Sequence, residues 1–212
     1  MKSSNQLQTT SPGSLQKLPV NSYTKHLLNA VMAGSTGAVF NEMCRYKENG
    51  EAMPIKVMEL VPVAERLPGL VKTYGNDKVA AVLSVSITKA LNNFNLRVGM
   101  NPDQITELCY QLIESANEDQ LAIQDIMLFL DGLVKAKYGK VYDRMDIPTF
   151  FEMLEVYREK RFQDYQSVKE EQNAQFKAMG DSNRSSTDVD KEANRNAMSE
   201  YLKSKYNEPP KL

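Results

Sequence analysis

Apolar residues recur at spacings of three and four along most of this chain, which is the pattern of amphipathic helices. The clearest runs lie within residues 76–94, 102–116, 124–136 and 147–157. Strong strand patterns do not interrupt them. The pattern predicts an all-α fold: a compact multi-helix domain with a long C-terminal helix that loses its apolar face after Arg158 and frays near Gly180.

Local signals mark where several helices begin and end. Asn101, followed by Pro102 and by Gln104, is typical of a helix start with a capping box. Asp146 is placed to cap the long helix. The run of residues 34–37, GSTG, predicts a kink or an end, and residues 47–51, KENGE, predict a polar turn. Prolines at 54, 62 and 68 favour short helical turns in that region, because an interior proline removes a hydrogen bond.

The apolar faces predict the core. We expect five residues from three helices to be buried against one another: Leu83, Ile87, Leu112, Phe129 and Leu133. The same periodicity places Val134 inward and continues an apolar pattern through Val39, Phe40, Met43 and Cys44. Glu114, Glu118, Asp119 and Asp125 have the appearance of a solvated helix end.

Both ends of the chain lack a periodic apolar face. Residues 1–20 are rich in Ser, Gln and Thr, and residues 180–196 are polar. Such segments bury too little apolar surface to offset the entropy of ordering. We therefore predict a disordered tail over 1–20, a helical domain over 21–178 and a flexible tail over 179–212.

Charge and cysteine content narrow the function classes. The chain has 26 basic and 27 acidic residues, a net charge of -1, so any contact with DNA or RNA must come from a local patch. Cys44 and Cys109 are expected to be buried thiols in a reducing compartment, with a disulfide as the alternative. The sequence shows neither a secretory signal nor an apolar membrane span. We therefore predict a cytoplasmic protein of its host cell.

Candidate catalytic and metal sites have simpler explanations. The GSTG run lacks the lysine that a phosphate-binding loop needs, because Ala38 follows it. His26 has no obvious catalytic partner. Asp143 and Asp146 resemble a carboxylate pair for a metal, but loop hydrogen bonding and helix capping explain them too. We therefore expect no enzyme activity, no cofactor and no metal.

The most specific feature is a basic loop with interleaved aromatics near residues 135–144. Positive charges beside aromatic rings suit phosphates and unstacked bases. The structural alternative is that Gly139 forms a left-handed turn, the tyrosines pack on the helices and Arg144 pairs with Asp146. The predicted nucleic-acid-binding residues are Lys135, Lys137, Tyr138, Lys140, Tyr142 and Arg144.

Part of this loop carries a family resemblance. The string YGKVYDR at residues 138–144, Met100 with Gln104-Ile105, and Tyr157 four residues before Arg161 resemble a family of small helical proteins from phages and conjugative elements of Bacteroidetes bacteria. The resemblance covers less than half of the chain and implies a mobile-element protein without a defined reaction.

By analogy, such proteins serve as adaptors in replication. The expected function is therefore a non-enzymatic replication-accessory adaptor of a phage or mobile element, similar to a helicase loader. Its partner would be a replicative helicase or another replication protein, with single-stranded DNA as an additional ligand and no membrane. The alternative is a phage structural or virion-packaged protein that binds virion proteins.

Overall fold

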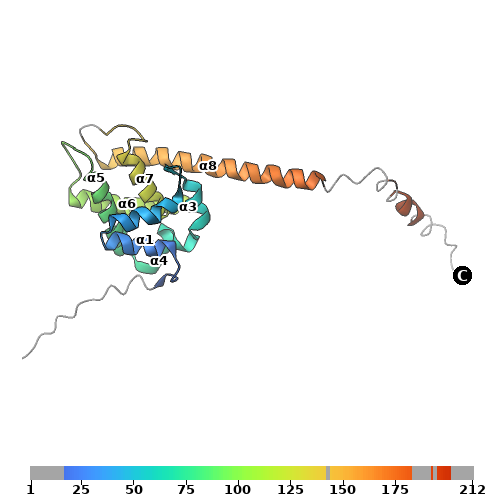
Figure 1. Ribbon diagram of the computed structural model, residues 1–212, viewed down its shortest axis with the longest axis horizontal. Helices are drawn as coiled ribbons and strands as arrows, with labels where there is room; N and C mark the ends of the chain where they lie inside the picture. Colours follow the sequence, from blue (N-terminus) through green and yellow to red (C-terminus); the bar gives the residue numbers. More distant parts are fainter. Residues whose placement is uncertain (1–16, 142–143, 183–191, 193–194, 202–212) are drawn as a thin grey trace, which may run out of the picture. The chain divides into compact units, whose positions relative to one another are not determined.

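A computed structural model describes residues 17–141, 144–182, 192 and 195–201, and these are mostly helical. The predicted all-α fold is confirmed. The elements follow one another in the order shown in Figure 1: α1 (Tyr23–Met32), α2 (Thr36–Met43), η2 (Cys44–Tyr46), β1 (Lys47–Glu48), β2 (Glu51–Ala52), α3 (Pro54–Leu60), η3 (Val63–Glu65), α4 (Leu67–Tyr74), α5 (Asn76–Leu91), α6 (Pro102–Asp119), α7 (Ile123–Val134) and α8 (Ile147–Ser182).

The chain divides into two compact units, Met1–Asp164 and Tyr165–Leu212. Within the first unit, packing begins before the predicted boundary at residue 20. Leu18 lies in the hydrophobic core, and the ammonium of Lys17 donates a hydrogen bond of 3.1 Å to the carbonyl of Thr73. Most of the two predicted tails, and Tyr142 and Asp143, lie outside the described residues.

The predicted helix starts are confirmed in their hydrogen bonds. Asn101 and Gln104 form a reciprocal capping box, with bonds of 2.8 and 2.9 Å between each backbone N–H and the other side chain. Asp146 accepts the backbone N–H of Thr149 at 3.1 Å and so caps α8. The GSTG run separates α1 from α2, and Ser35 is the N-cap of α2. These caps are local, so short sequence patterns specify them.

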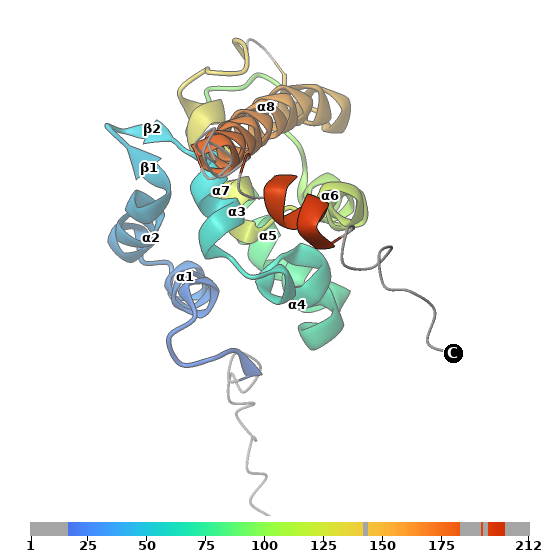
Figure 2. The ribbon, with the colours of Figure 1, turned by 90° about the vertical axis from the view of Figure 1, so that its right-hand side faces the viewer.

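α7 is the central helix of the first unit (Figure 2), and most of its side chains are buried. The five predicted core residues are all buried, as expected from their periodicity. The inward placement of Val134 was wrong, because the last turn of α7 reaches the surface and leaves this side chain 41% exposed. Among the described helices, even α8, the longest, lacks an apolar stretch able to cross a membrane.

The predicted polar turn is the tip of a small hairpin. Lys47 pairs with Ala52 and Glu48 with Glu51 in antiparallel register. Asn49 and Gly50 both have positive φ, 50° and 82°, as a two-residue hairpin turn requires. The hairpin follows α2 and η2 (Figure 2). Its Lys47 pairs with Asp131 near the end of α7, and its Glu51 pairs with Lys137 just beyond that end.

Candidate protein-binding surface

The basic loop is largely neutralised by carboxylates. Lys135 pairs with Asp131 at 2.8 Å, and Arg144 pairs with Asp146 at 3.1 Å. Lys137 pairs with Glu51 of the hairpin. Lys140 is exposed, and within the described part of the chain it has no acidic partner. Among the described residues of the loop, three of the four predicted cations are therefore engaged in ion pairs, although Lys135 shares its carboxylate with Lys47.

Tyr138 packs on the domain, as the structural alternative predicted. Its ring stacks on Phe129 with a centroid distance of 5.2 Å and meets Tyr157 edge-on at 6.2 Å. Burial raises the pKa of Tyr138 to about 12. Gly132 provides the space, since a β-carbon there would lie 2.4 Å from the phenol oxygen. Gly139, with φ of 120°, forms the expected positive-φ turn.

Of the four acidic residues predicted to form a solvated helix end, Glu114 and Glu118 of α6 are exposed as expected, but the prediction was wrong for Asp119 and Asp125. Asp125 is fully buried, and Arg161 of α8 lies 3.2 Å from it. Asp119 forms a 2.9 Å ion pair with Arg158. Burial raises the pKa of both carboxyl groups, and the two arginines oppose that rise. These groups hold α8 against the corner between α6 and α7.

The two thiols differ, which corrects the expectation that both are buried. Cys44 is exposed and Cys109 is buried, and the two are not joined by a disulfide. Burial raises the pKa of the Cys109 thiol to about 12, so this thiol is unreactive at neutral pH. His26 is exposed on α1.

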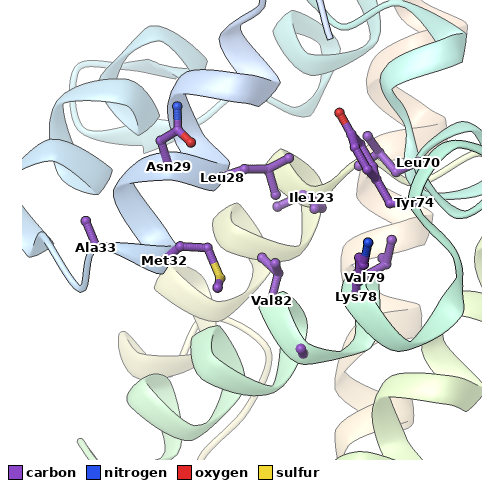
Figure 3. A pocket seen from close by; sticks show the side chains of 11 residues that line it. Leu28, Asn29, Met32, Ala33, Leu70, Tyr74, Lys78, Val79, Val82 and Ile123 are labelled. Carbon is purple, nitrogen blue, oxygen red and sulfur yellow. The ribbon is translucent and has the colours of Figure 1, made fainter. Parts of the chain in front are cut away.

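Sequence patterns did not reveal the hollows of the first unit. One of them, with a volume of about 500 Å³, we call the α1–α4–α5 pocket. Figure 3 shows side chains of α1, among them Leu28 and Met32, facing those of α4 and α5, with Ile123 of α7 between them. Most of its lining is aliphatic, while Asn29, Tyr74 and Lys78 contribute polar atoms.

The second hollow, which we call the α2–α5–α7 groove, has a volume of about 270 Å³. Residues from the end of α1 and the start of β1 complete its lining. The residues that line its three helical walls are Thr36, Val39, Phe40 and Met43 of α2; Val85, Ser86, Lys89 and Ala90 of α5, with Asn93 just beyond its end; and Met127, Leu130, Asp131 and Val134 of α7.

Large apolar side chains are exposed in the lining of both hollows. Met32 is 58% exposed, Phe40 60%, Val85 46% and Val134 41%. We call these four residues the apolar face. Periodicity misplaced Val134, and it recorded Phe40 only as part of an apolar stripe, without showing that this side chain is exposed. On α5, Val85 lies outside the apolar stripe that the sequence predicts to be buried. An apolar residue in that position was the sequence signal for an exposed binding residue.

Charged side chains surround the groove. One oxygen of Asp131 lies 2.8 Å from the ammonium groups of both Lys47 and Lys135. Burial raises the pKa of Asp131, but the two lysines outweigh this effect and hold the pKa below its usual value. Lys89 donates a hydrogen bond of 2.6 Å to the hydroxyl of Thr36, which is neutral. The groove therefore has more positive than negative charge.

Comparison with protein-family models, with curated proteins and with solved structures finds no match for this chain. The family resemblance of the loop therefore stays a prediction.

Proposed function

We propose that this chain is a non-enzymatic adaptor that binds a protein partner through the apolar face. The observation that carries the proposal is the exposure of Met32, Phe40 and Val85 in the lining of two hollows that both have walls on α1 and α5. Single exposed apolar side chains are normal on a protein, but a group of them around concave apolar surface marks an interaction site.

The energetics favour a protein partner. Fully burying a side chain such as Phe, Val or Met contributes about 1.5–3 kcal/mol each. The floor of the α2–α5–α7 groove needs no rearrangement, because Val31, Met43 and Leu130 are already packed in the core. A partner that covers this surface removes exposed apolar area at little conformational cost.

The roles of the perturbed carboxylates support a non-enzymatic reading. Asp125 and Asp119 are engaged by arginines, and Asp146 caps a helix. Within the described residues, groups of three or more His, Cys, Asp or Glu side chains that could hold a metal ion are absent. These three carboxylates therefore have structural roles.

The biological setting of the proposal comes from the resemblance alone. It favours an adaptor in the replication of a phage or mobile element, with a replicative helicase or other replication protein as partner. A virion protein is the alternative partner. DNA is a secondary ligand in this proposal, because three of the four loop cations already pair with carboxylates.

Affinity purification from the host cell tests the proposal. The tagged full chain is compared with Val85→Asp, which places a charge in the groove, and with Val156→Asp. Val156 of α8 is 51% exposed and lies outside both hollows, so it is a matched control. We expect a partner that the wild type and Val156→Asp retain and that Val85→Asp loses, with all three folded by circular dichroism.

Identification of the retained protein separates the two settings: a helicase or primase supports replication, and a capsid or portal protein supports the virion. If Val85→Asp and Phe40→Asp retain the partner as well as the wild type does, the proposed surface is wrong.

A further inference from the structure

We infer that the α2–α5–α7 groove receives an amphipathic helix of the partner protein, with carboxylates flanking the apolar stripe of that helix. This inference rests on the proposed function and specifies the chemistry of the partner. It is carried by the spacing of the lining residues along the helices of the groove and by the excess of positive charge around the groove.

The groove walls have the geometry of an incomplete helix bundle. α2 and α7 each line the groove with four residues at positions i, i+3, i+4 and i+7. This spacing is one face of a helix, the arrangement by which helices pack on each other. From Thr36 to Met43 on α2, and from Met127 to Val134 on α7, the lining runs about 10 Å at ~1.5 Å per residue. The groove therefore suits roughly two turns of a fourth helix.

An extended strand fits this surface poorly. A strand that joins a sheet gains most of its affinity from backbone hydrogen bonds along an exposed edge. The walls of this groove are helices, and the backbone groups in the middle of a helix already bond within it. Side chains, not backbone groups, must supply the contacts, and a helix presents them at the matching spacing.

The charges around the groove specify the flanks of that helix. Lys47 and Lys89 lie in its lining, where Asp131 is the one carboxylate among the described residues, and Lys135 lies just outside the lining, paired with Asp131. Lys47 and Lys135 share Asp131, and among the residues that the structure describes Lys89 bonds to the hydroxyl of Thr36 and to no carboxylate.

Nearby carboxylates do not offset this excess. Glu42 pairs with Arg45, Glu48 pairs with Lys56, and Glu51 pairs with Lys137. Complementarity therefore calls for carboxylates on the partner, beside its apolar residues.

Nucleic acid would match the cations but not the apolar walls. Phosphate contacts leave apolar side chains such as Phe40 and Val85 without a partner, whereas a protein helix satisfies both features. The two classes of ligand also differ in the test, because only the protein helix depends on both Val85 and Lys89.

Two synthetic helical peptides test the inference on the full chain. Both carry apolar residues at i, i+3, i+4 and i+7, and they differ only in flanking Glu or flanking Lys. Fluorescence anisotropy at low and high salt gives their affinities. We expect the Glu peptide to bind roughly tenfold more tightly at low salt and to lose this preference as salt rises.

Variants link the preference to the groove. Lys89→Gln should reduce the preference for the Glu peptide several-fold, while Lys72→Gln should leave it unchanged, because Lys72 is an exposed lysine of α4 outside the lining of the groove. Val85→Asp should abolish binding of both peptides. If Val85→Asp binds the peptides as tightly as the wild type does, the inference is overturned.

The remaining outcomes separate this inference from the proposed function. Equal binding of both peptides, lost in Val85→Asp, overturns the acidic chemistry and leaves the protein-binding face in place. Binding of neither peptide overturns the helical occupant, and the purification experiment then decides the proposed function independently. Self-association of the chain that Val85→Asp abolishes would identify a second copy as the occupant and overturn the inference.

Discussion

The phenol of Tyr157 donates a hydrogen bond of 2.8 Å to a carboxylate oxygen of Asp125, and both side chains are buried. The same carboxylate accepts the backbone N–H of Ala122 at 2.9 Å and pairs with Arg161. Tyr157 and Arg161 lie one turn apart on α8, so a single acidic residue of α7 fixes that turn. This contact sets the register of α8 on the helical core.

Removing Asp125 should therefore be strongly destabilising. Asp125→Ala leaves the buried guanidinium of Arg161 without its counterion, and loss of one partner of a buried ion pair costs about 3–5 kcal/mol. Tyr157→Phe removes one hydrogen bond and should cost about 1–3 kcal/mol. Urea denaturation monitored by circular dichroism measures both.

Glu155→Ala is the control for these two variants. Glu155 pairs with Arg158 on the exposed side of α8, at 2.6 Å, and its loss should cost less than about 1 kcal/mol. A similar small effect of Asp125→Ala would show that the buried network does not support α8.

Gly132→Ala should destabilise the domain by about 1–3 kcal/mol, because the added carbon would collide with the ring of Tyr138. Gly37 is the matched control: it lies in α2 with open space around it, and Gly37→Ala should be neutral or stabilising by up to about 1 kcal/mol. In the double variant with Tyr138→Ala, the cost of Gly132→Ala should vanish. Additive losses in denaturation would contradict the packing role of Tyr138.

Local patterns explain the part of the fold that the sequence predicted. The cap of Asn101 and Gln104 and the cap of Asp146 depend on residues three apart, and the buried face of α5 follows from its own periodicity. These features need no knowledge of distant contacts.

Long-range contacts explain what the sequence did not predict. Lys137 and Glu51 are 86 positions apart, and the partners of the buried Asp125 include Tyr157 and Arg161 of α8, which are distant in the sequence. The groove is another such case, since its walls come from helices distant in the chain and its exposed residues resemble core residues in a periodic pattern.

The two cysteines should differ in reactivity. We expect a disulfide-exchange reagent such as 5,5′-dithiobis(2-nitrobenzoic acid) to modify one thiol per native chain near pH 8, namely Cys44, which is exposed. Cys109 is buried with a pKa of about 12 and should react only after unfolding in guanidinium. Mass spectrometry of the labelled peptides identifies the site. Equal labelling of both in the native state would contradict the packing of α6.

The Asp146 cap should make stability depend on pH in the acid range. Hydrogen bonds from Thr149 hold the pKa of Asp146 below its usual value. A depressed carboxyl pKa contributes stability above the unfolded value, near ~4, and this contribution is lost as pH falls through the folded value. Asp146→Asn keeps a capping side chain but does not titrate, so it should preserve neutral-pH stability and flatten this acid loss.

Asp146→Ala is the companion variant, because it removes the cap as well as the titration and should be less stable than wild type at neutral pH. Thermal denaturation at a series of pH values compares the three proteins. An unchanged acid loss in Asp146→Asn would assign that loss to other carboxylates.

The loop that includes residues 135–144 should bind DNA weakly if at all, and fluorescence anisotropy at low salt with single-stranded and duplex DNA measures this. Lys135, Lys137 and Arg144 already pair with carboxylates, and Tyr138 is packed on Phe129, so few groups remain for phosphates or bases. Lys140 is the test position. If the loop did bind, Lys140→Glu would weaken the affinity and reduce the salt slope by about one, as loss of one phosphate contact does.

Lys72→Glu changes the net charge equally on α4, away from this loop, and separates a local contact from a general charge effect. Binding that is tight, salt-dependent and selectively weakened by Lys140→Glu would mean that the carboxylate pairs open on contact with phosphate. DNA would then become a principal ligand beside the protein partner. Absence of DNA binding by the folded chain would mean that the basic loop has a structural role. Ion pairs there tie the C-terminal end of α7 to the hairpin, and the tyrosine of the loop fills the space beside Gly132.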